Sequence, residues 1–140
     1  MLSGTEKARA RVILADDHLG VLEDLRALLD QEFEVVATVG NGNELVAAAE
    51  TLAPDVIVTD IGMPVLNGIG AAEQIVRMNP AARIVFVTVH SDLETVEKSL
   101  AIGAMGYVLK RRAGVDLVPA IHAALQGKRH LSPTVAARSR

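Results

Sequence analysis

The chain alternates short apolar runs with longer segments of helical spacing, and this alternation constrains its fold more than any other feature. The apolar runs are rich in valine and isoleucine and are too short for helices. Such runs are typical of strands that are buried on both faces of a parallel sheet. We predict strands at residues 12–15, 35–39, 56–59, 84–89 and 107–109.

Helices are predicted where apolar residues recur every three or four positions, because this spacing gives a helix one face to pack on a core. The five stripes are Val21, Leu22, Leu25, Leu28 and Leu29; Leu45, Val46, Ala49 and Leu52; Ile69, Ala72, Ile75 and Val76; Val96 and Leu100; and Val115, Val118, Ile121 and Leu125. Five such units imply right-handed crossovers with helices on both sides of one sheet. The sequence therefore predicts an α/β, flavodoxin-like, doubly wound fold with five parallel strands in the order 2-1-3-4-5 and five helices.

Composition excludes several classes of function. The 140 residues fit one domain and contain no cysteine, which rules out disulfides and cysteine-ligated zinc. No segment has the length of a membrane span and the N-terminus does not resemble a signal peptide, so we expect a cytoplasmic protein with no membrane contact. The net charge of −3, with basic residues gathered after Gly127, argues against nucleic-acid binding by this chain itself.

Polar residues lie at the carboxyl ends of four of the five predicted strands, where ligands bind in sheets of this kind. Asp16 and Asp17 are at the end of the first strand, Asp60 of the third, Thr88 of the fourth and Lys110 of the fifth. Three carboxylates at one edge favour a bound cation, and oxygen ligands suit Mg²⁺. A lysine and a hydroxyl beside them are suited to a phosphoryl group, and a carboxylate is able to accept it as an aspartyl phosphate. Asp60 is the candidate acceptor.

Each residue taken alone has a plainer interpretation. An acid pair such as Asp16-Asp17 often caps a helix, Asp60 could be a turn residue, Thr88 an ordinary strand residue and Lys110 a surface lysine. Their coincidence at strand ends favours the functional interpretation for the set.

The sequence resembles the receiver domain of two-component response regulators from about residue 11 to residue 132. The resemblance rests on four motifs, which are Asp16-Asp17-His18, Asp60-Ile61-Gly62-Met63-Pro64 with Gly68, Thr88, and residues 103–110 ending in Tyr107-Val108-Leu109-Lys110. It is strongest toward the branch whose members carry a C-terminal DNA-binding domain of the LuxR type. Residues 127–133 are similar to the corresponding run in that branch.

The resemblance implies a role for each matching position. Asp60 would accept phosphate from a sensor histidine kinase or phosphotransfer protein, with Asp16, Asp17, Asp60 and the Gly62 carbonyl around Mg²⁺. Lys110 would pair with the phosphoryl oxygens and Thr88 would bond to one of them. Tyr107 would move from exposed to buried as the switch residue, although a lone tyrosine on an apolar strand also simply packs. The chain would catalyse only its own phosphorylation and dephosphorylation.

Some positions depart from the family pattern. Arg111 replaces a proline that often follows the lysine, and because a cis bond before a non-proline residue costs about 3 kcal/mol, we predict a trans bond. Leu19-Gly20 leaves the start of the first helix uncertain. Gly62 and His90 occupy positions that tune phosphate lifetime, which the sequence does not predict. His18 could ligate a transition metal, but a helix-start or surface position is favoured.

The resemblance also suggests how the chain is divided. We predict an N-terminal tail at residues 1–10, a receiver domain at residues 11–127, and a tail or linker at residues 128–140. The LuxR-type output domain is absent, which favours truncation over a free-standing receiver, and a homodimer is possible. Alternative functions are a phosphohydrolase, for which Gly62 replaces the general acid expected two residues after the nucleophile, and an interaction module without phosphorylation. A nucleotide-binding domain lacks the expected glycine-rich loop.

Overall fold

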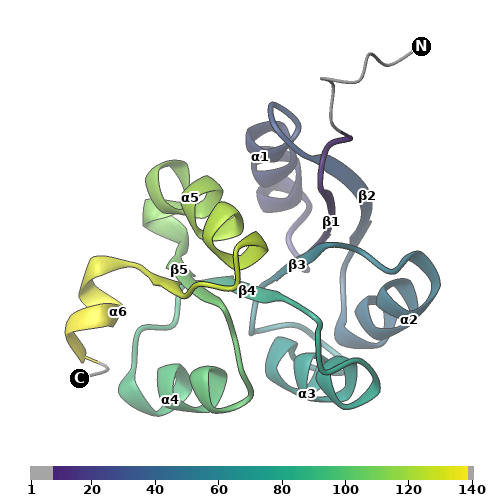
Figure 1. Cartoon of the computed structure of the whole chain (residues 1–140). Coiled ribbons are helices and arrows are strands. Elements are labelled where there is room, and N and C mark those ends of the chain that lie inside the picture. The colour runs from purple at the N-terminus through teal and green to yellow at the C-terminus, as the bar shows by residue number, and fades with distance from the viewer. Residues whose placement is uncertain (1–7, 139–140) are drawn as a thin grey trace.

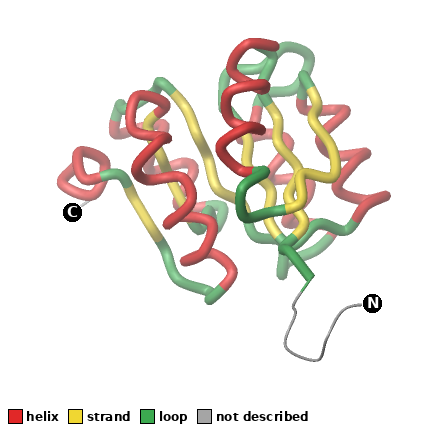
Figure 2. The backbone as a smooth tube through the Cα atoms, turned by 90° about the horizontal axis from the view of Figure 1, so that it is seen from above, coloured by secondary structure: helices red, strands yellow, loops and turns green. Residues whose placement is uncertain are grey.

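The structure, a computed structural model, describes residues 8–138 and consists of one parallel sheet between two layers of helices (Figures 1 and 2). The strands lie in the order β2-β1-β3-β4-β5-β6 and every neighbouring pair is parallel. Their bounds are β1 Arg11–Ala15, β2 Glu34–Val39, β3 Val56–Thr59, β4 Ile84–Thr88, β5 Gly106–Leu109 and β6 His130–Leu131. The predicted order of the first five strands is confirmed.

The helices cover both faces of the sheet. Their bounds are α1 Leu19–Leu29, α2 Gly42–Leu52, α3 Gly68–Met78, α4 Leu93–Ala101, α5 Ala113–Leu125 and α6 Pro133–Arg138, with a 3-10 turn, η1, at Lys110–Arg112. Figure 1 shows α1 and α5 on one face of the sheet and α2, α3 and α4 on the other. The apolar residues of these two groups of helices belong to two separate core clusters. The crossovers therefore bring the carboxyl ends of all six strands to one edge of the sheet.

The predicted count of five strands and five helices was incomplete, because β6 and α6 follow α5 within the described residues. β6 pairs with β5, and the side chain of Val135 from α6 is fully buried in the core on the α4 side. A proline in the first turn of a helix leaves no amide unsatisfied, which suits Pro133 to the start of α6. The division at residue 127 stays a prediction, and residues 1–7 of the predicted N-terminal tail lie outside the described residues.

One predicted helix stripe was wrong in detail. α5 buries Ala113, Leu117, Ala120 and Ala124 beside Ile121, whereas the predicted core residue Val115 is exposed. α5 is apolar on most of its surface, so its sequence leaves the direction of the core ambiguous. The small alanines allow the helix to lie close to β4 and β5.

Polar side chains cap the N-termini of three helices, as expected for residues of these types. Asn41 accepts the amide of Glu44 before α2, Asn67 accepts that of Gly70 before α3, and Asp92 accepts that of Thr95 before α4. α1 begins without such a bond, after His18, and its start at Leu19 resolves the uncertainty raised by Leu19-Gly20. The predicted trans bond after Lys110 is confirmed, since no cis peptide occurs in residues 8–138.

Candidate functional site

The predicted site residues lie at one edge of the sheet, directly after the strands that carry them. Asp16 follows β1, Asp60 follows β3, Thr88 ends β4 and Lys110 follows β5. Asp16, Asp60 and Thr88 are buried although all three are polar. Because buried polar groups need hydrogen-bond or ionic partners, the partners of these three side chains define the site.

Lys110 joins the two buried carboxylates. Its Nζ lies 2.8 Å from Asp16 Oδ2 and 2.9 Å from Asp60 Oδ2, and its side chain is only 17% exposed. Burial opposes the charged form of Lys110, but the hydrogen bonds to Asp16 and Asp60 outweigh it and raise the pKa of Lys110 above its ordinary value. The ammonium group is therefore charged and in direct contact with the candidate acceptor.

Asp60 is held from both sides of its carboxylate. Oδ1 accepts the amide N–H of Ile61 at 2.7 Å, while Oδ2 receives Lys110. The start of α3 lies against the same residue, because a Cβ atom at Gly68 would overlap the carbonyl oxygen of Asp60. These contacts fix the position of the carboxylate at the end of β3.

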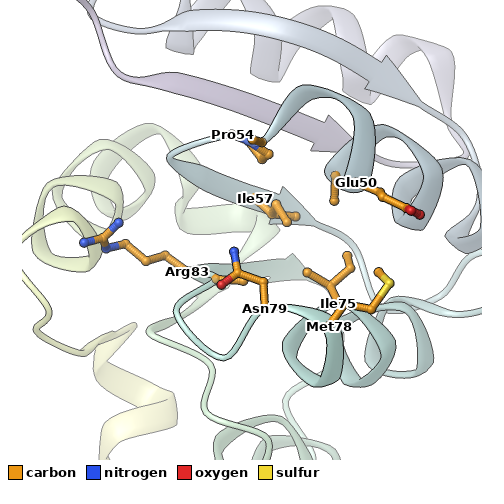
Figure 3. A pocket seen from close by; sticks show the side chains of 10 residues that line it. Glu50, Pro54, Ile57, Ile75, Met78, Asn79 and Arg83 are labelled. Atoms are coloured by element: carbon orange, nitrogen blue, oxygen red, sulfur yellow. The ribbon is translucent and has the colours of Figure 1, made fainter.

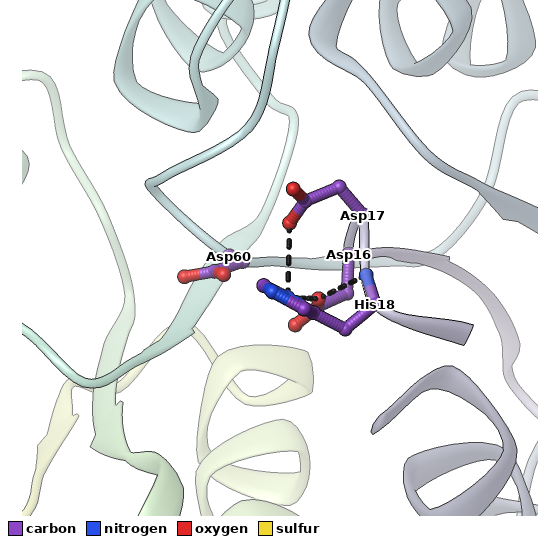
Figure 4. A group of neighbouring side chains, drawn as sticks. All are labelled: Asp16, Asp17, His18 and Asp60. Carbon is purple, nitrogen blue, oxygen red and sulfur yellow. Dashed lines mark hydrogen bonds and ion pairs between the residues drawn. The ribbon is translucent and has the colours of Figure 1, made fainter. Parts of the chain in front are cut away.

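Asp17 and His18 complete an acidic cluster with Asp16 and Asp60, which Figure 4 shows from close by. One ligand atom from each of the four residues lies within 4.8 Å of the others. The ring of His18 is 65% exposed, and its Nδ1 lies 3.1 Å from both Asp16 Oδ1 and Asp17 Oδ1. His18 is thus a histidine at the start of a helix, as favoured from the sequence, and its ring contacts both aspartates.

This cluster fits the magnesium ion that the sequence led us to expect. Mg²⁺ prefers oxygen ligands, usually takes one or two carboxylates and keeps several waters. Asp16, Asp17 and Asp60 supply carboxylate oxygens within reach of one another, and one of the three, Asp17, is exposed to solvent. The donor set therefore suits a hard cation better than a transition metal.

Thr88 and Tyr107 meet at the loop after β4. Thr88 Oγ accepts the amide N–H of His90 at 3.3 Å, and the Tyr107 hydroxyl donates to the His90 carbonyl at 2.8 Å. Tyr107 is fully buried, and burial raises the pKa of its phenol above the ordinary value. The predicted movement of Tyr107 stays a prediction, since the structure shows the buried position alone.

Our sequence analysis missed two other buried polar residues near this edge. Asp116 lies in the first turn of α5 and Ser132 follows β6, and the two side chains are hydrogen bonded to each other. Aspartate and serine are mostly exposed residues, so neither suggests burial by itself. The placement of Asp116 on the same face as Leu117 and Ala120 was the available signal.

A separate pocket of about 400 Å³ lies between α2 and α3 (Figure 3). Pro54 and Arg83, which line it, come just before β3 and β4, so the pocket is at the amino ends of these strands. The side chain of Arg83 points away from it in Figure 3. The pocket is thus remote from the acidic edge and does not belong to this site.

Comparison with known proteins agrees with the geometry. The family model "Response regulator receiver domain" matches residues 12–122. The transcriptional regulatory protein DegU of Brevibacillus brevis is 33% identical over 129 residues, which are 91% of this chain and 55% of that protein. The chain spans 55–62% of the length of four curated relatives that it matches at 33–35% identity.

Solved structures show the same fold. A LuxR-family two-component response regulator from an Aurantimonas species has a TM-score of 0.90 at 35% identity, over 94% of this chain and 96% of that one. The isolated receiver domain of RcsB from Salmonella enterica serovar Typhimurium, determined with the phosphate mimic BeF3−, has a TM-score of 0.86 at 29% identity, over 94% and 99%. Within residues 8–138, no helix is both long enough and apolar enough to cross a membrane.

Proposed function

This chain belongs to the response regulator receiver domain family, and on that premise we propose that it is a signalling switch that accepts a phosphoryl group on Asp60. The observation that carries the proposal is the position of Lys110, whose Nζ contacts both Asp16 and Asp60 within 2.9 Å at the carboxyl edge of the sheet. A half-buried lysine held against two carboxylates is arranged for a negatively charged group that arrives between them.

The transfer itself needs few protein groups. A carboxylate oxygen of Asp60 attacks the phosphorus of a phosphohistidine, the phosphorus–nitrogen bond breaks, and the electron pair returns to the imidazole of the donor. Lys110, released in part from Asp60, pairs with the phosphoryl oxygens, and the Thr88 hydroxyl donates to one of them. The product is an aspartyl phosphate on the chain itself, so the chain does not convert a separate substrate through repeated turnovers.

Magnesium is proposed as the cofactor. Asp16, Asp17, Asp60 and the carbonyl of Gly62 would hold it, with Asp16 acting mainly through water. When bound, the ion would neutralise charge on the phosphoryl oxygens. The three carboxylates that gather within 4.8 Å of one another support this proposal.

A sensor histidine kinase or a phosphotransfer protein is proposed as the donor. Large apolar side chains stand exposed just beyond the site residues of four strands. They are Leu19 after β1, Val65 after β3, Val89 after β4 and Val115 after β5. Exposed apolar side chains in the segments that follow the site residues fit a protein partner whose histidine must reach Asp60.

The output is proposed to be a change at β5 and the loop after β4. A phosphoryl group that draws Thr88 away from His90 would disturb the bond between His90 and Tyr107, and so bias a two-state equilibrium. DNA binding would require a LuxR-type domain outside this chain; RcsB, a structural relative, is known as a DNA complex. Pairing of two copies and a cytoplasmic location are also proposed.

The deciding experiment is the intact mass of the chain after incubation with acetyl phosphate and Mg²⁺. One added phosphoryl group is expected on the native chain and on Asp24→Asn, whose aspartate is exposed on α1, and none on Asp60→Asn. An equal adduct on Asp60→Asn would mean that another residue is the acceptor. No adduct and no binding of Mg²⁺ with BeF3− would favour an interaction module instead.

A further inference from the structure

Asp116 and Ser132 are buried polar residues that no step of the proposed phosphotransfer uses. Ser132 Oγ donates to Asp116 Oδ2 at 2.9 Å and accepts the amide N–H of Leu109 at 3.1 Å. Arg112 Nε donates to the same Asp116 oxygen at 2.9 Å. The carboxylate and the hydroxyl thus form one network in which each group has a partner.

This network encloses the turn that carries Lys110. Leu109 comes just before η1 and Arg112 ends it, so both ends of the turn are attached to Asp116, one of them through Ser132. Because Lys110 is the first residue of η1, the direction of its side chain depends on the backbone of this turn. Its two contacts with carboxylates, at 2.8 and 2.9 Å, leave little freedom for displacement.

The same network connects the turn to the C-terminal segment. The amide of Ser132 donates to the carbonyl of Tyr107 at 2.9 Å, and that of His130 donates to Met105 at 2.9 Å. Val135 is fully buried in the core cluster that contains Tyr107. Any displacement of η1 therefore acts on β6 and α6 as well as on the lysine.

We propose that Asp116 and Ser132 are positioning residues for Lys110 and that they couple the acidic edge of the sheet to the segment formed by β6 and α6. The inference rests on the proposed function for its role in signalling. Coupling of this kind is reciprocal. If a phosphoryl group at Asp60 changes the free energy of a contact made by α6, that contact changes the free energy of phosphoryl binding at the lysine by the same amount.

Arg129 supplies a control within the same segment. Its guanidinium donates to the carbonyls of Ala104 at 3.0 Å and Leu100 at 2.9 Å, and neither of these two hydrogen bonds reaches η1. Arg129→Ala should loosen the segment without releasing the turn. Ser132→Thr keeps the hydroxyl, whereas Ser132→Ala and Asp116→Ala remove the network at two different points.

The test is the rate at which each lysine reacts with an amine-acetylating reagent, read by peptide mass without Mg²⁺ or phosphate. The exposed Lys98 serves as the internal reference in every sample. We expect Lys110 to react several-fold faster in Ser132→Ala and Asp116→Ala than in the native chain, and at the native rate in Ser132→Thr and Arg129→Ala. Thermal unfolding of each variant shows whether it is folded at the labelling temperature.

Two results would overturn the inference. The first is a native labelling rate for Lys110 in both Ser132→Ala and Asp116→Ala, and the second is an equal increase in Arg129→Ala. Because the measurement needs no phosphate, it is independent of the phosphotransfer proposal. A companion titration with BeF3− and Mg²⁺ separates the two: no binding by the native chain sinks the switch, whatever the labelling shows.

Discussion

Thr88 and Tyr107, on neighbouring strands, hold the same backbone residue from opposite ends. Thr88 Oγ accepts the amide of His90 while the Tyr107 hydroxyl donates to its carbonyl. The loop after β4 is therefore attached to the end of β4 and to β5 at one residue. A group that competes for the Thr88 hydroxyl changes one of these two attachments.

The shared attachment predicts that Thr88→Ala and Tyr107→Phe are not additive. Each variant should lower the free energy of unfolding by about 1 kcal/mol through the lost hydrogen bond. In the double variant, the free energy of unfolding should fall by about 0.5 kcal/mol less than the sum of the two single losses. Once one hydrogen bond to His90 is lost, the loop is less ordered, and the second hydrogen bond contributes less. Urea unfolding of the four chains measures this coupling. Thr88→Ser loses a buried methyl group but keeps the hydroxyl, so its effect should be additive with that of Tyr107→Phe. Strict additivity of Thr88→Ala with Tyr107→Phe would contradict the prediction.

Lys110→Met should make stability depend strongly on magnesium. The variant leaves two buried carboxylates without their cation, which should lower the free energy of unfolding by about 3 kcal/mol in a chelator. Added Mg²⁺ should restore much of this loss, and more than it gives to the native chain. The measurement is denaturant unfolding with and without the ion.

Lys98→Met is the matched control for that experiment. Its exposed pair with Glu94, at 3.3 Å, should contribute no more than about 0.5 kcal/mol. A Lys110→Met variant as stable as Lys98→Met in the chelator would show that the carboxylates do not depend on the lysine.

Much of the fold was predictable because periodicity reports burial. The strand at Val56–Thr59 matches the predicted range at both ends, since all four of its residues are buried and apolar or β-branched. β6 was missed because it has only two residues, His130 and Leu131, which are too few to show a hydrophobic periodicity. Val115 was misplaced because its helix is apolar on most sides, so packing of small alanines decided the outcome.

The candidate site was predictable to the extent that its residues end strands. Parallel strands bring their carboxyl ends together, so Asp16, Asp60 and Lys110 had to lie near one another. The attachment of Lys110 through Ser132 was not predictable, because it depends on the pairing of β5 with β6 and on a hydrogen bond between Leu109 and Ser132, which are 23 residues apart. Local sequence does not encode such a contact.

Asp116 should make stability sensitive to acid. Burial opposes its ionisation, but hydrogen bonds from Arg112 and Ser132 outweigh it and lower its pKa below the ordinary value of 3.8. The unfolded chain then binds the proton more readily, so the stabilisation is present above pH 3.8 and is lost as the pH falls through the lower folded pKa. The free-energy difference between the native chain and Asp116→Asn should be constant near neutral pH and should shrink below that value. A constant difference throughout would contradict this assignment.

Val65→Gly should stabilise the chain. Val65 has a φ of 69° and is 78% exposed, so a β-branched residue occupies a left-handed conformation without packing in return. Relief of this strain should outweigh the greater freedom of glycine in the unfolded chain and raise the free energy of unfolding by about 1 kcal/mol. Thermal unfolding measures the change.

Val115→Gly is the opposite case at a similar exposure. Val115 lies inside α5, where glycine weakens a helix, so this variant should lose up to about 1 kcal/mol. If both substitutions shift stability in the same direction, the backbone at Val65 is not strained.

The two hydrogen-bonded residues of β6 also affect how copies of this chain are able to associate. A parallel strand at the border of a sheet offers unpaired amides and carbonyls to any extended segment, including one from another molecule. β6 covers β5 with two residues only, and a border that short gives an intruding strand little to align with. Association on this side of the molecule should therefore proceed through helix surfaces. Contacts between helix surfaces form and separate without exchange of strands. That is the reversible kind of contact that a signalling component requires.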